Sequence, residues 1–120
     1  MDIVQQSLGA VPVIRVRGEL DRLNAPALER ILRIHLRAGN HRLLLDLSDC
    51  PYVDSGGLAA ILTTAIDIQD GGLLAIVAPS LPIRRLLELV GLYEHRHCAI
   101  FKGERDALSA LAVEPQRTQA

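Results

Sequence analysis

The sequence predicts a small α/β sandwich: a mainly parallel sheet of about four to five strands, opened by a hairpin and covered by about four helices. Two observations lead to this prediction. Short apolar segments alternate with segments of helical periodicity through most of the chain, and strands joined by helices pair in parallel through right-handed crossovers. Before them, two β-branched segments stand on either side of Leu8-Gly9-Ala10, which indicates an antiparallel hairpin.

The hairpin is expected to pair Ile3-Val4 with residues 11–16, which end before Gly18. A helix follows, because Asn24 is a favoured N-cap residue and Pro26 suits the first helical turn. The residues that share its inner face are Leu28, Ile31, Leu32, His35 and Leu36, and Gly39-Asn40 ends it.

The next predicted strand covers residues 42–47, and the turn at Cys50-Pro51-Tyr52 separates it from a second helix. Ser55 is expected in the first turn of that helix, which ends at Asp70-Gly71-Gly72. The apolar residues that recur at helical spacing are Leu58, Ile61, Leu62, Ala65, Ile66 and Ile68.

The last third of the sequence predicts a strand over residues 73–78 and a third helix capped by Ser80, with Pro82 in its first turn. Gly91 is expected to end this helix in the left-handed conformation. A strand over Cys98–Phe101 and a helix over residues 104–113 complete the fold. The side chains expected to face inward are Ile83, Leu86, Leu87, Val90, Ala107, Leu108 and Leu111. The helix-covered face of the sheet should take Leu44, Leu74 and Ile76 or their immediate neighbours, since the sequence does not fix which of the alternating residues point inward.

Residues 1–113 are expected to form a single domain and residues 114–120 a flexible polar tail. A chain of 120 residues buries about two thirds of its unfolded surface, so a core can form without disulfides, and Cys50 and Cys98 are expected to be free thiols. No apolar run approaches the roughly 18 residues of a membrane span, so we expect a cytoplasmic protein that does not insert into membranes.

The composition argues against nucleic-acid binding, because 13 basic and 14 acidic residues leave a net charge of −1 and no global electrostatic attraction to nucleic acid. Only three aromatic residues, Tyr52, Tyr93 and Phe101, are available to stack on bases. The same scarcity argues weakly against a large permanent interface, whose centre is commonly aromatic-rich. We therefore expect a monomer or a weak dimer.

Ser55 is the candidate functional residue, because the amino terminus of a helix offers unpaired N–H groups and a favourable dipole to a phosphate. The simpler interpretation is that Ser55 is an ordinary N-cap. Gly56 and Gly57 weaken it, since each glycine costs a helix about 1 kcal/mol relative to alanine. The glycines would also leave the hydroxyl uncovered for another protein's active site. Asp54 either caps the helix as well or orients Ser55.

Catalysis is not expected, and no cofactor is implied. Asp54-Ser55-Gly56-Gly57 matches the nucleophile loop of trypsin-like proteases, but those enzymes assemble their triad from two β-barrels in a longer chain. A nucleophile elbow would need glycine where Val53 stands, and no histidine is placed to activate the hydroxyl. His95 and His97 alternate as on one side of a strand, yet with too few partner ligands for zinc, so we interpret them as a solvated strand end and predict no metal site.

Together, six segments resemble the STAS domain of the anti-sigma-factor antagonist family over roughly residues 3–111. They are Gly18-Glu19-Leu20-Asp21, Asn24-Ala25-Pro26, Leu45-Asp46-Leu47-Ser48, Val53-Asp54-Ser55-Gly56-Gly57-Leu58, Gly71-Gly72 and Leu87-Glu88-Leu89-Val90-Gly91-Leu92. The resemblance implies that the cognate anti-sigma factor, a serine kinase of the GHKL ATPase type, phosphorylates Ser55. The unphosphorylated antagonist would bind this kinase and free the sigma factor, the phosphorylated form would let go, and a phosphatase would reset it.

The resemblance also implies a partner-binding set of Asp21, Asp54, Ser55, Gly56, Gly57 and Leu58, in which Asp21 lies near Ser55 and helps to dock the kinase. Gly56 departs from the family, which usually has Ser, Thr or Ala after the phosphorylated serine. The alternative function is that of a STAS regulatory subunit of an ABC-type lipid transporter, which would bind its partner without a phosphate switch.

Overall fold

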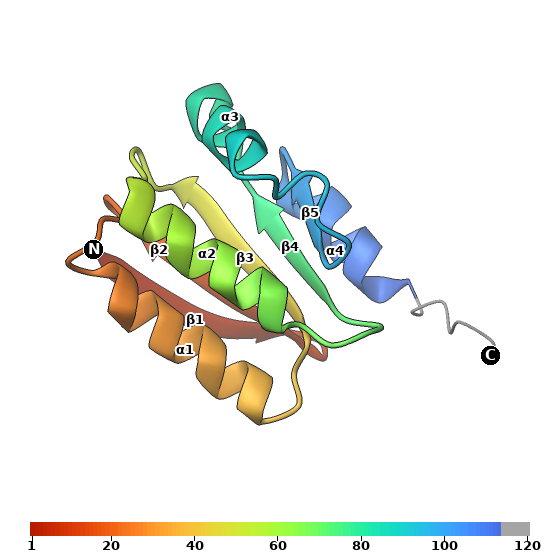
Figure 1. The fold of residues 1–120 in the computed structure, drawn as a ribbon. Coiled ribbons are helices and arrows are strands. Elements are labelled where there is room, and N and C mark those ends of the chain that lie inside the picture. Colours follow the sequence, from red (N-terminus) through yellow and green to blue (C-terminus); the bar gives the residue numbers. More distant parts are fainter. Residues whose placement is uncertain (114–120) are drawn as a thin grey trace.

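Strands and helices alternate along the chain after an opening hairpin, in a computed structural model that describes residues 1–113 (Figure 1). The elements are β1 (Asp2–Leu8), β2 (Val11–Arg17), α1 (Ala25–Arg37), β3 (Arg42–Asp49), α2 (Ser55–Asp67), β4 (Leu73–Val77), α3 (Leu81–Leu89), β5 (Cys98–Phe101) and α4 (Glu104–Ala112). The predicted tail, residues 114–120, lies outside the described residues.

The sheet has five strands in the order β1-β2-β3-β4-β5. β1 and β2 pair antiparallel, and a turn at Gly9-Ala10 joins them, where Gly9 adopts a φ of 63° that side chains disfavour. The pairs β2–β3, β3–β4 and β4–β5 are all parallel. The predicted fold class, a mainly parallel sheet opened by a hairpin, is therefore confirmed.

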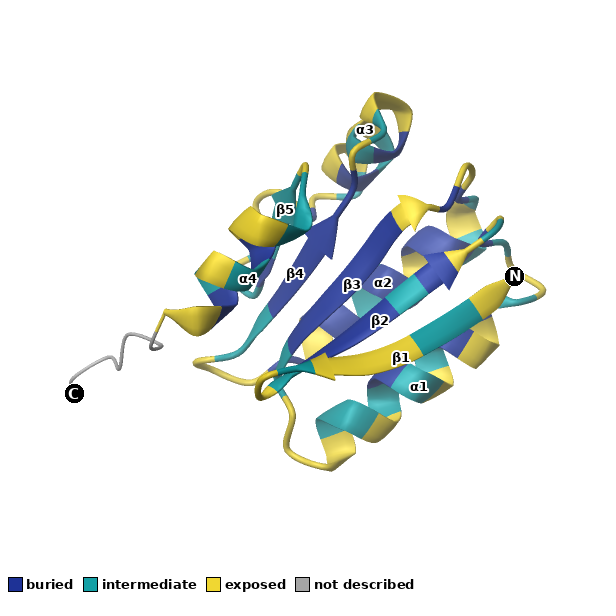
Figure 2. Ribbon diagram, turned by 180° about the vertical axis from the view of Figure 1, so that it is seen from behind, coloured by how far each residue is buried: buried dark blue, intermediate teal, exposed yellow. Residues whose placement is uncertain are grey.

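Helices cover both faces of the sheet. Figures 1 and 2 show α1 and α2 on one face and α4 on the other. Leu74 and Ile76 point into the larger core cluster, which α1, α2 and α3 complete through Leu28, Ile61 and Leu87. Leu44 belongs instead to the smaller cluster beneath α4, with Ala107 and Leu111. Of the alternatives left open, the face of Leu74 and Ile76 takes Leu43 and Leu45, the immediate neighbours of Leu44, because the parallel strands pair Leu44 with Ala75 and Leu45 with Ile76.

Two predicted N-caps stand at the right place but do not cap with their side chains. Asn24 precedes α1, yet its Oδ1 accepts the N–H of Asp21 at 2.9 Å and its Nδ2 donates to the carbonyl of Glu19 at 2.9 Å. The Asn24 amide therefore closes the turn between β2 and α1. Ser80 precedes α3 and makes no side-chain cap bond either, whereas Gly91 has the predicted left-handed φ, at 82°.

The second helix is shorter than the sequence predicts. Its last residue is Asp67, because Ile68 takes an extended conformation with ψ of 132°. Ile68 is buried beyond the helix end, while Ile66, one of the apolar residues that recur at helical spacing, is 61% exposed. The apolar spacing extends past the point where the helix ends, and Ile66 falls on the outer face of its last turn.

Candidate functional site

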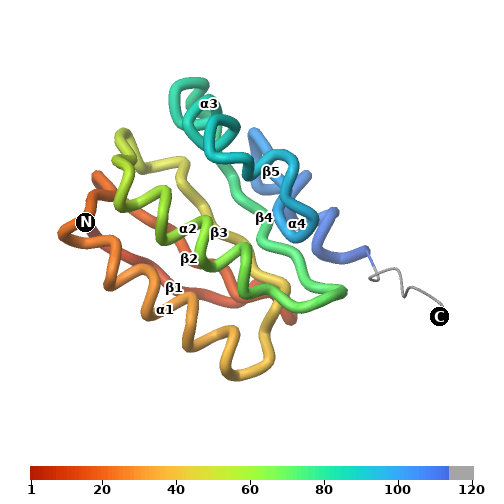
Figure 3. Tube along the Cα trace, in the orientation of Figure 1, coloured from red at the N-terminus to blue at the C-terminus, as the bar shows by residue number. Residues whose placement is uncertain are grey.

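The candidate site lies where the β2–α1 and β3–α2 loops meet, at the carboxyl end of the parallel strands (Figure 3). Leu20 and Val53 form a parallel bridge beyond the ends of β2 and β3. Its hydrogen bonds run from the N–H of Leu20 to the carbonyl of Tyr52, at 2.9 Å, and from the N–H of Asp54 to the carbonyl of Leu20, at 3.1 Å. The sheet pairing thus extends into both loops and fixes the first loop against the start of α2.

Asp54 is the N-cap of α2 and the link between the two loops. One carboxylate oxygen accepts the N–H of Gly57 at 3.0 Å, and the other accepts the N–H of Arg22 at 3.1 Å. These N–H groups, first that of Gly57 and then that of Arg22, hold the pKa of Asp54 below its ordinary value. Of the two roles left open for Asp54, the structure therefore establishes the cap, and its oxygens are bound to main-chain N–H groups.

Ser55 is the first residue of α2 and is exposed. The interpretation of Ser55 as the N-cap is wrong, because the preceding residue, Asp54, occupies that position with extended backbone. Ser55 instead lies where the positive end of the helix dipole meets solvent, and no acidic residue stands in the first turn of α2. The histidine hydrogen bonds among residues 1–113 are made with Gln5, Gln69 and other residues away from Ser55.

The two glycines after Ser55 have a structural cause. A Cβ on Gly56 would lie 2.5 Å from the Cβ of Arg22, and a Cβ on Gly57 would lie 2.8 Å from the Cγ of Leu20. Both separations are too short for real atoms, so the glycines let the β2–α1 loop lie directly on α2. The expectation that these glycines only expose the Ser55 hydroxyl to a partner is therefore incomplete, since the β2–α1 loop of this chain itself packs closely against them.

Asp21 lies in that same loop, half-buried. Its carboxylate accepts the N–H groups of Leu23 at 2.9 Å and Asn24 at 3.0 Å, and so shapes the turn into α1. Asp21 lies at the Ser55 end of the sheet, because the N–H of its neighbour Arg22 is bound to Asp54 at the start of α2. Gly57 and Leu58 are buried, and Leu58, only 8% exposed, packs in the larger core cluster. Of the predicted set, Asp54, Ser55 and Gly56 are the members with accessible surface beside the hydroxyl.

Sequence reasoning missed three residues of this end of the molecule. Arg22 lies on Gly56, while Leu23 and Tyr52, on the two loops, are 85% and 52% exposed. Contiguous apolar patches mark interaction surfaces, and both side chains lie on the loops that meet at this end of the sheet. The signal available was Tyr52, an aromatic residue in a predicted turn.

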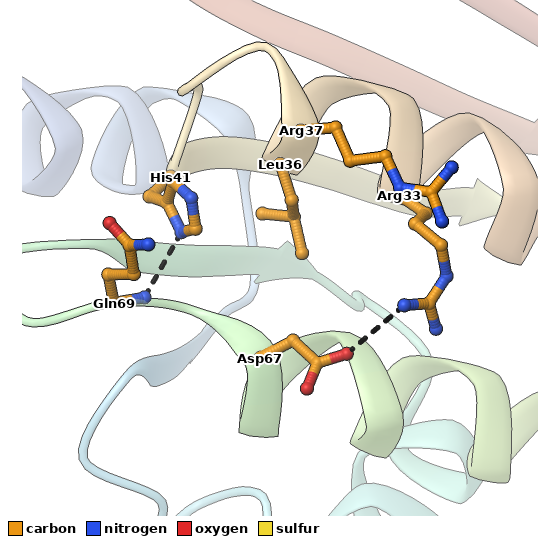
Figure 4. A pocket seen from close by; sticks show the side chains of 6 residues that line it. All are labelled: Arg33, Leu36, Arg37, His41, Asp67 and Gln69. Carbon is orange, nitrogen blue, oxygen red and sulfur yellow. Dashed lines mark hydrogen bonds and ion pairs between the residues drawn. The ribbon is translucent and has the colours of Figure 1, made fainter.

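A groove of about 480 Å³ lies at the far end of α1 and α2 (Figure 4). Its lining residues are Arg33, Leu36, Arg37, His41, Asp67 and Gln69. The Nδ1 of His41 accepts the N–H of Gln69 at 3.0 Å, and Arg33 pairs with Asp67 at 3.5 Å. Basic side chains suit the carboxyl ends of helices, so the groove needs no ligand to explain its charge.

His95 and His97 lie in the turn before β5, with ring centres 6.0 Å apart. The side chain of His97 is 12% exposed, and its Nε2 lies 3.5 Å from Asp70, which also accepts a hydrogen bond from Arg96. Among residues 1–113, no group of three or more His, Cys, Asp or Glu side chains is arranged to hold a metal ion. The same part of the chain contains no helix with the length and apolar character needed to cross a bilayer.

Both cysteines are buried free thiols. Burial raises the pKa of Cys98 to about 12, and it also raises the pKa of Cys50, whose Sγ donates to the carbonyl of Tyr52. A thiol with a raised pKa is a poor nucleophile at neutral pH.

Comparisons with known proteins agree with the fold described above. The family model described as Mlab, STAS domain, matches residues 3–100. An anti-sigma F factor antagonist of Paenibacillus polymyxa is 32% identical over 106 residues, which cover 86% of this chain and 88% of the relative. The crystal structure of an anti-sigma factor antagonist from Mycobacterium paratuberculosis is 27% identical, with a TM-score of 0.84 and coverage of 92% of each chain.

The phosphorylated form of the Bacillus cell fate determinant SpoIIAA is 18% identical, with a TM-score of 0.71 over 92% of this chain and 99% of that one. At this identity the likeness is one of fold. The matches cover the hairpin, the parallel sheet and the segment that carries Asp54 and Ser55. The chain therefore belongs to the STAS-domain family of anti-sigma-factor antagonists.

Proposed function

We propose that the protein is an anti-sigma-factor antagonist that binds a GHKL-type serine kinase acting as the anti-sigma factor, and that phosphorylation of Ser55 releases it. The observation that carries the proposal is the exposed Ser55 at the first position of α2, after the Asp54 cap. The name of the Paenibacillus relative supports the antagonist role. The protein regulates by binding, catalyses no reaction and uses no cofactor.

The surface around Ser55 supports binding to a protein. Leu23 and Tyr52 are exposed on the two loops that meet at this end of the sheet, and the loop that contains Asp21 and Arg22 is fixed to α2 by Asp54. A partner would contact Asp21, Asp54, Ser55 and Gly56 directly. Gly57 and Leu58, which are buried, would hold this surface in shape from beneath.

A phosphate at Ser55 would act on this interface by charge. It adds about −1.5 to −2 charges at neutral pH, and closing an interface over such a group incurs desolvation and repulsion. The amino terminus of α2 stabilises the phosphate on the free antagonist, so the modification favours dissociation. A phosphatase then restores the binding form. Transcription control of this kind takes place in the cytoplasm, where we expect the protein to act.

Partner capture tests the proposal. Wild-type protein, Ser55→Asp and the control Ser109→Asp, which adds the same charge to an exposed position on α4, are each used to capture partners from lysate of the source cells. Captured proteins are identified by mass spectrometry, and the captured kinase is incubated with wild-type protein and ATP. We expect wild type and Ser109→Asp to retain a GHKL-type kinase, Ser55→Asp to lose it, and Ser55 to gain a phosphate.

Two results would contradict the proposal. Recovery of a transporter ATPase by all three proteins would identify the chain as a STAS subunit of an ABC-type transporter, bound without a switch. An unmodified Ser55 in the presence of saturating kinase and ATP would contradict the proposed phosphorylation.

A further inference from the structure

We propose that Arg22 is the phosphate-pairing residue of this site, whose guanidinium group binds the phosphoryl group carried by Ser55. The inference rests on the proposed phosphorylation of Ser55 and assigns to this chain itself a cation that holds the phosphate. Three observations support it: the close approach of Arg22 to Gly56, the exposure of Arg22 without an ion-pair partner among residues 1–113, and the carboxylate of Asp54 directly next to Ser55.

The main chain places Arg22 against the residue that follows Ser55. The N–H of Arg22 donates to Asp54 at 3.1 Å, and a Cβ built on Gly56 would lie 2.6 Å from the Cα of Arg22 and 2.5 Å from its Cβ. No residue with a side chain fits at position 56 unless this loop moves away. The glycine at position 56 therefore allows residue 22 to approach this closely, so the Arg22 side chain begins beside the residue that follows Ser55.

The side chain of Arg22 has the length to reach Ser55. Successive Cα atoms along the chain are about 3.8 Å apart, and an arginine side chain extends its five N–H donors further than that. Arg22 is exposed, and the ion pairs formed within residues 1–113 leave its guanidinium unpaired, whereas Arg15, Arg33 and Arg96 are held by carboxylates. After the N–H groups of Gly57, Arg22 and Gly56, the charge of Arg22 also lowers the pKa of Asp54, so its field reaches the start of α2.

The positive charge of Arg22 opposes the repulsion expected between Asp54 and a phosphate on Ser55. Asp54 is a carboxylate directly next to Ser55, and a phosphoryl group there brings two like charges together. A guanidinium binds a phosphate through parallel N–H bonds, which are among the stronger hydrogen bonds in proteins. Arg22 thereby offsets the repulsion from Asp54 and lowers the pKa of the second phosphate ionisation.

The test measures that pKa without any kinase. Phosphoserine is introduced at position 55 during translation with an expanded genetic code, and the phosphorus NMR shift is followed across the pH range. Wild type is compared with Arg22→Gln, Arg22→Lys and the control Arg37→Gln, which removes an arginine at the far end of α1. Urea denaturation of each variant establishes that it is folded before its titration is interpreted.

We expect the phosphoserine pKa to rise by about 0.5 unit in Arg22→Gln, roughly a threefold gain in proton affinity. Arg22→Lys should fall between this value and that of wild type, because lysine keeps the charge and loses the paired geometry. Arg37→Gln should match wild type. Equal pKa values in wild type and Arg22→Gln would overturn the inference, and so would an equal rise in Arg37→Gln.

The outcome is independent of partner capture. If no kinase is recovered from lysate, the proposed function fails while the titration still reports whether Arg22 pairs with the phosphate. If the kinase is recovered and the pKa does not respond to Arg22, the inference fails while the proposed function stands.

Discussion

Asp54 joins two segments that lie 32 residues apart, by accepting N–H groups from Arg22 and Gly57. These bonds lower the pKa of Asp54, so the stability of the fold depends on pH in a defined direction. A carboxyl with a lower pKa in the folded state than its ordinary value of about 3.9 stabilises the fold above that pH. The stabilisation is lost as the pH falls through the lower, folded-state pKa.

We therefore predict that Asp54→Ala lowers the urea midpoint at pH 7, because the cap and the loop contact are both removed. The difference from wild type should narrow in acid, below about pH 3.9, where the carboxyl of the unfolded chain is protonated. Asp54→Asn separates the two contacts, since asparagine does not titrate and keeps one acceptor oxygen for the Gly57 cap, while its NH2 group cannot accept the N–H of Arg22. Equal midpoints for wild type and Asp54→Ala at pH 7 would contradict the role assigned to Asp54.

Gly56 provides a second test at the scale of one residue. Alanine favours a helix by about 1 kcal/mol over glycine, but its Cβ would overlap Arg22 at 2.5 Å. The clash should dominate, and we predict that Gly56→Ala destabilises the protein by about 1–3 kcal/mol in urea denaturation. The control is Gly103→Ala, whose Cβ would meet no atom within 4 Å and whose cost as a helix cap is below about 1 kcal/mol. A stabilising Gly56→Ala would mean that the loop does not lie on α2.

The buried thiols give a third prediction. With a pKa of about 12, Cys98 is roughly one part in ten thousand thiolate at pH 8, against about a quarter for an ordinary thiol. Native protein should therefore react slowly with an aromatic disulfide reagent at pH 8, and both cysteines should react at once in urea. Rapid reaction of two thiols in the native protein would contradict their burial.

These residue roles were only partly accessible from the sequence. Asp54 and Ser55 were found because they precede an apolar helix pattern, but which of them caps the helix depends on a backbone angle. The need for glycine at position 56 depends on Arg22, a residue distant in the sequence, whose approach no local pattern indicates.

At the scale of elements, α4 is held to the sheet by charge as well as by packing. Arg15 on β2 pairs with Asp46 on β3 and with Glu104 at the start of α4. At the other end, Arg42 on β3 donates to the carbonyls of Ala110, Leu111 and Val113. Arginines on two strands thus fix both ends of the helix.

We predict that Arg15→Met destabilises the protein by about 2 kcal/mol, because Asp46, with 9% of its side chain exposed, loses its cation. The hydroxyl and N–H of Ser48 still bind Asp46 and limit the cost. The control Arg17→Met breaks an exposed pair with Asp49 and should cost below about 0.5 kcal/mol. Urea denaturation and hydrogen exchange of α4 measure both variants, and equal effects would contradict a special role for Arg15.

The order and type of the helices and strands were predictable, because the spacing of apolar residues changes wherever turn residues interrupt the chain. The strand over Cys98–Phe101 is as predicted, and α4 ends one residue before the expected position 113. The end of α2 was not predictable from spacing, since Ile68 is apolar and buried although it is no longer helical. The pairing of Arg15 with Glu104 likewise depends on three elements that meet only in the folded state.

At the scale of the whole molecule, the two ends of the parallel strands carry different features. The loops that follow β2 and β3 meet at the Ser55 end, and the groove lined by Arg33 and His41 lies at the other (Figures 3 and 4). A phosphate at Ser55 would therefore alter one interaction surface and leave the sheet unchanged. The sequence indicated this arrangement through its alternation of strands and helices, but a partner's identity depends on the partner's surface as much as on this one.

The most direct measurement of the central claim is competition for the anti-sigma factor. Unmodified protein and protein with phosphoserine at position 55 are titrated separately into the complex of the captured anti-sigma factor with its sigma factor, and released sigma factor is measured. We predict that the unmodified protein releases the sigma factor, and that the phosphorylated protein requires at least about a tenfold higher concentration, a difference of about 1.4 kcal/mol. Equal release by both forms would contradict control by Ser55, and no release by either would contradict the antagonist function.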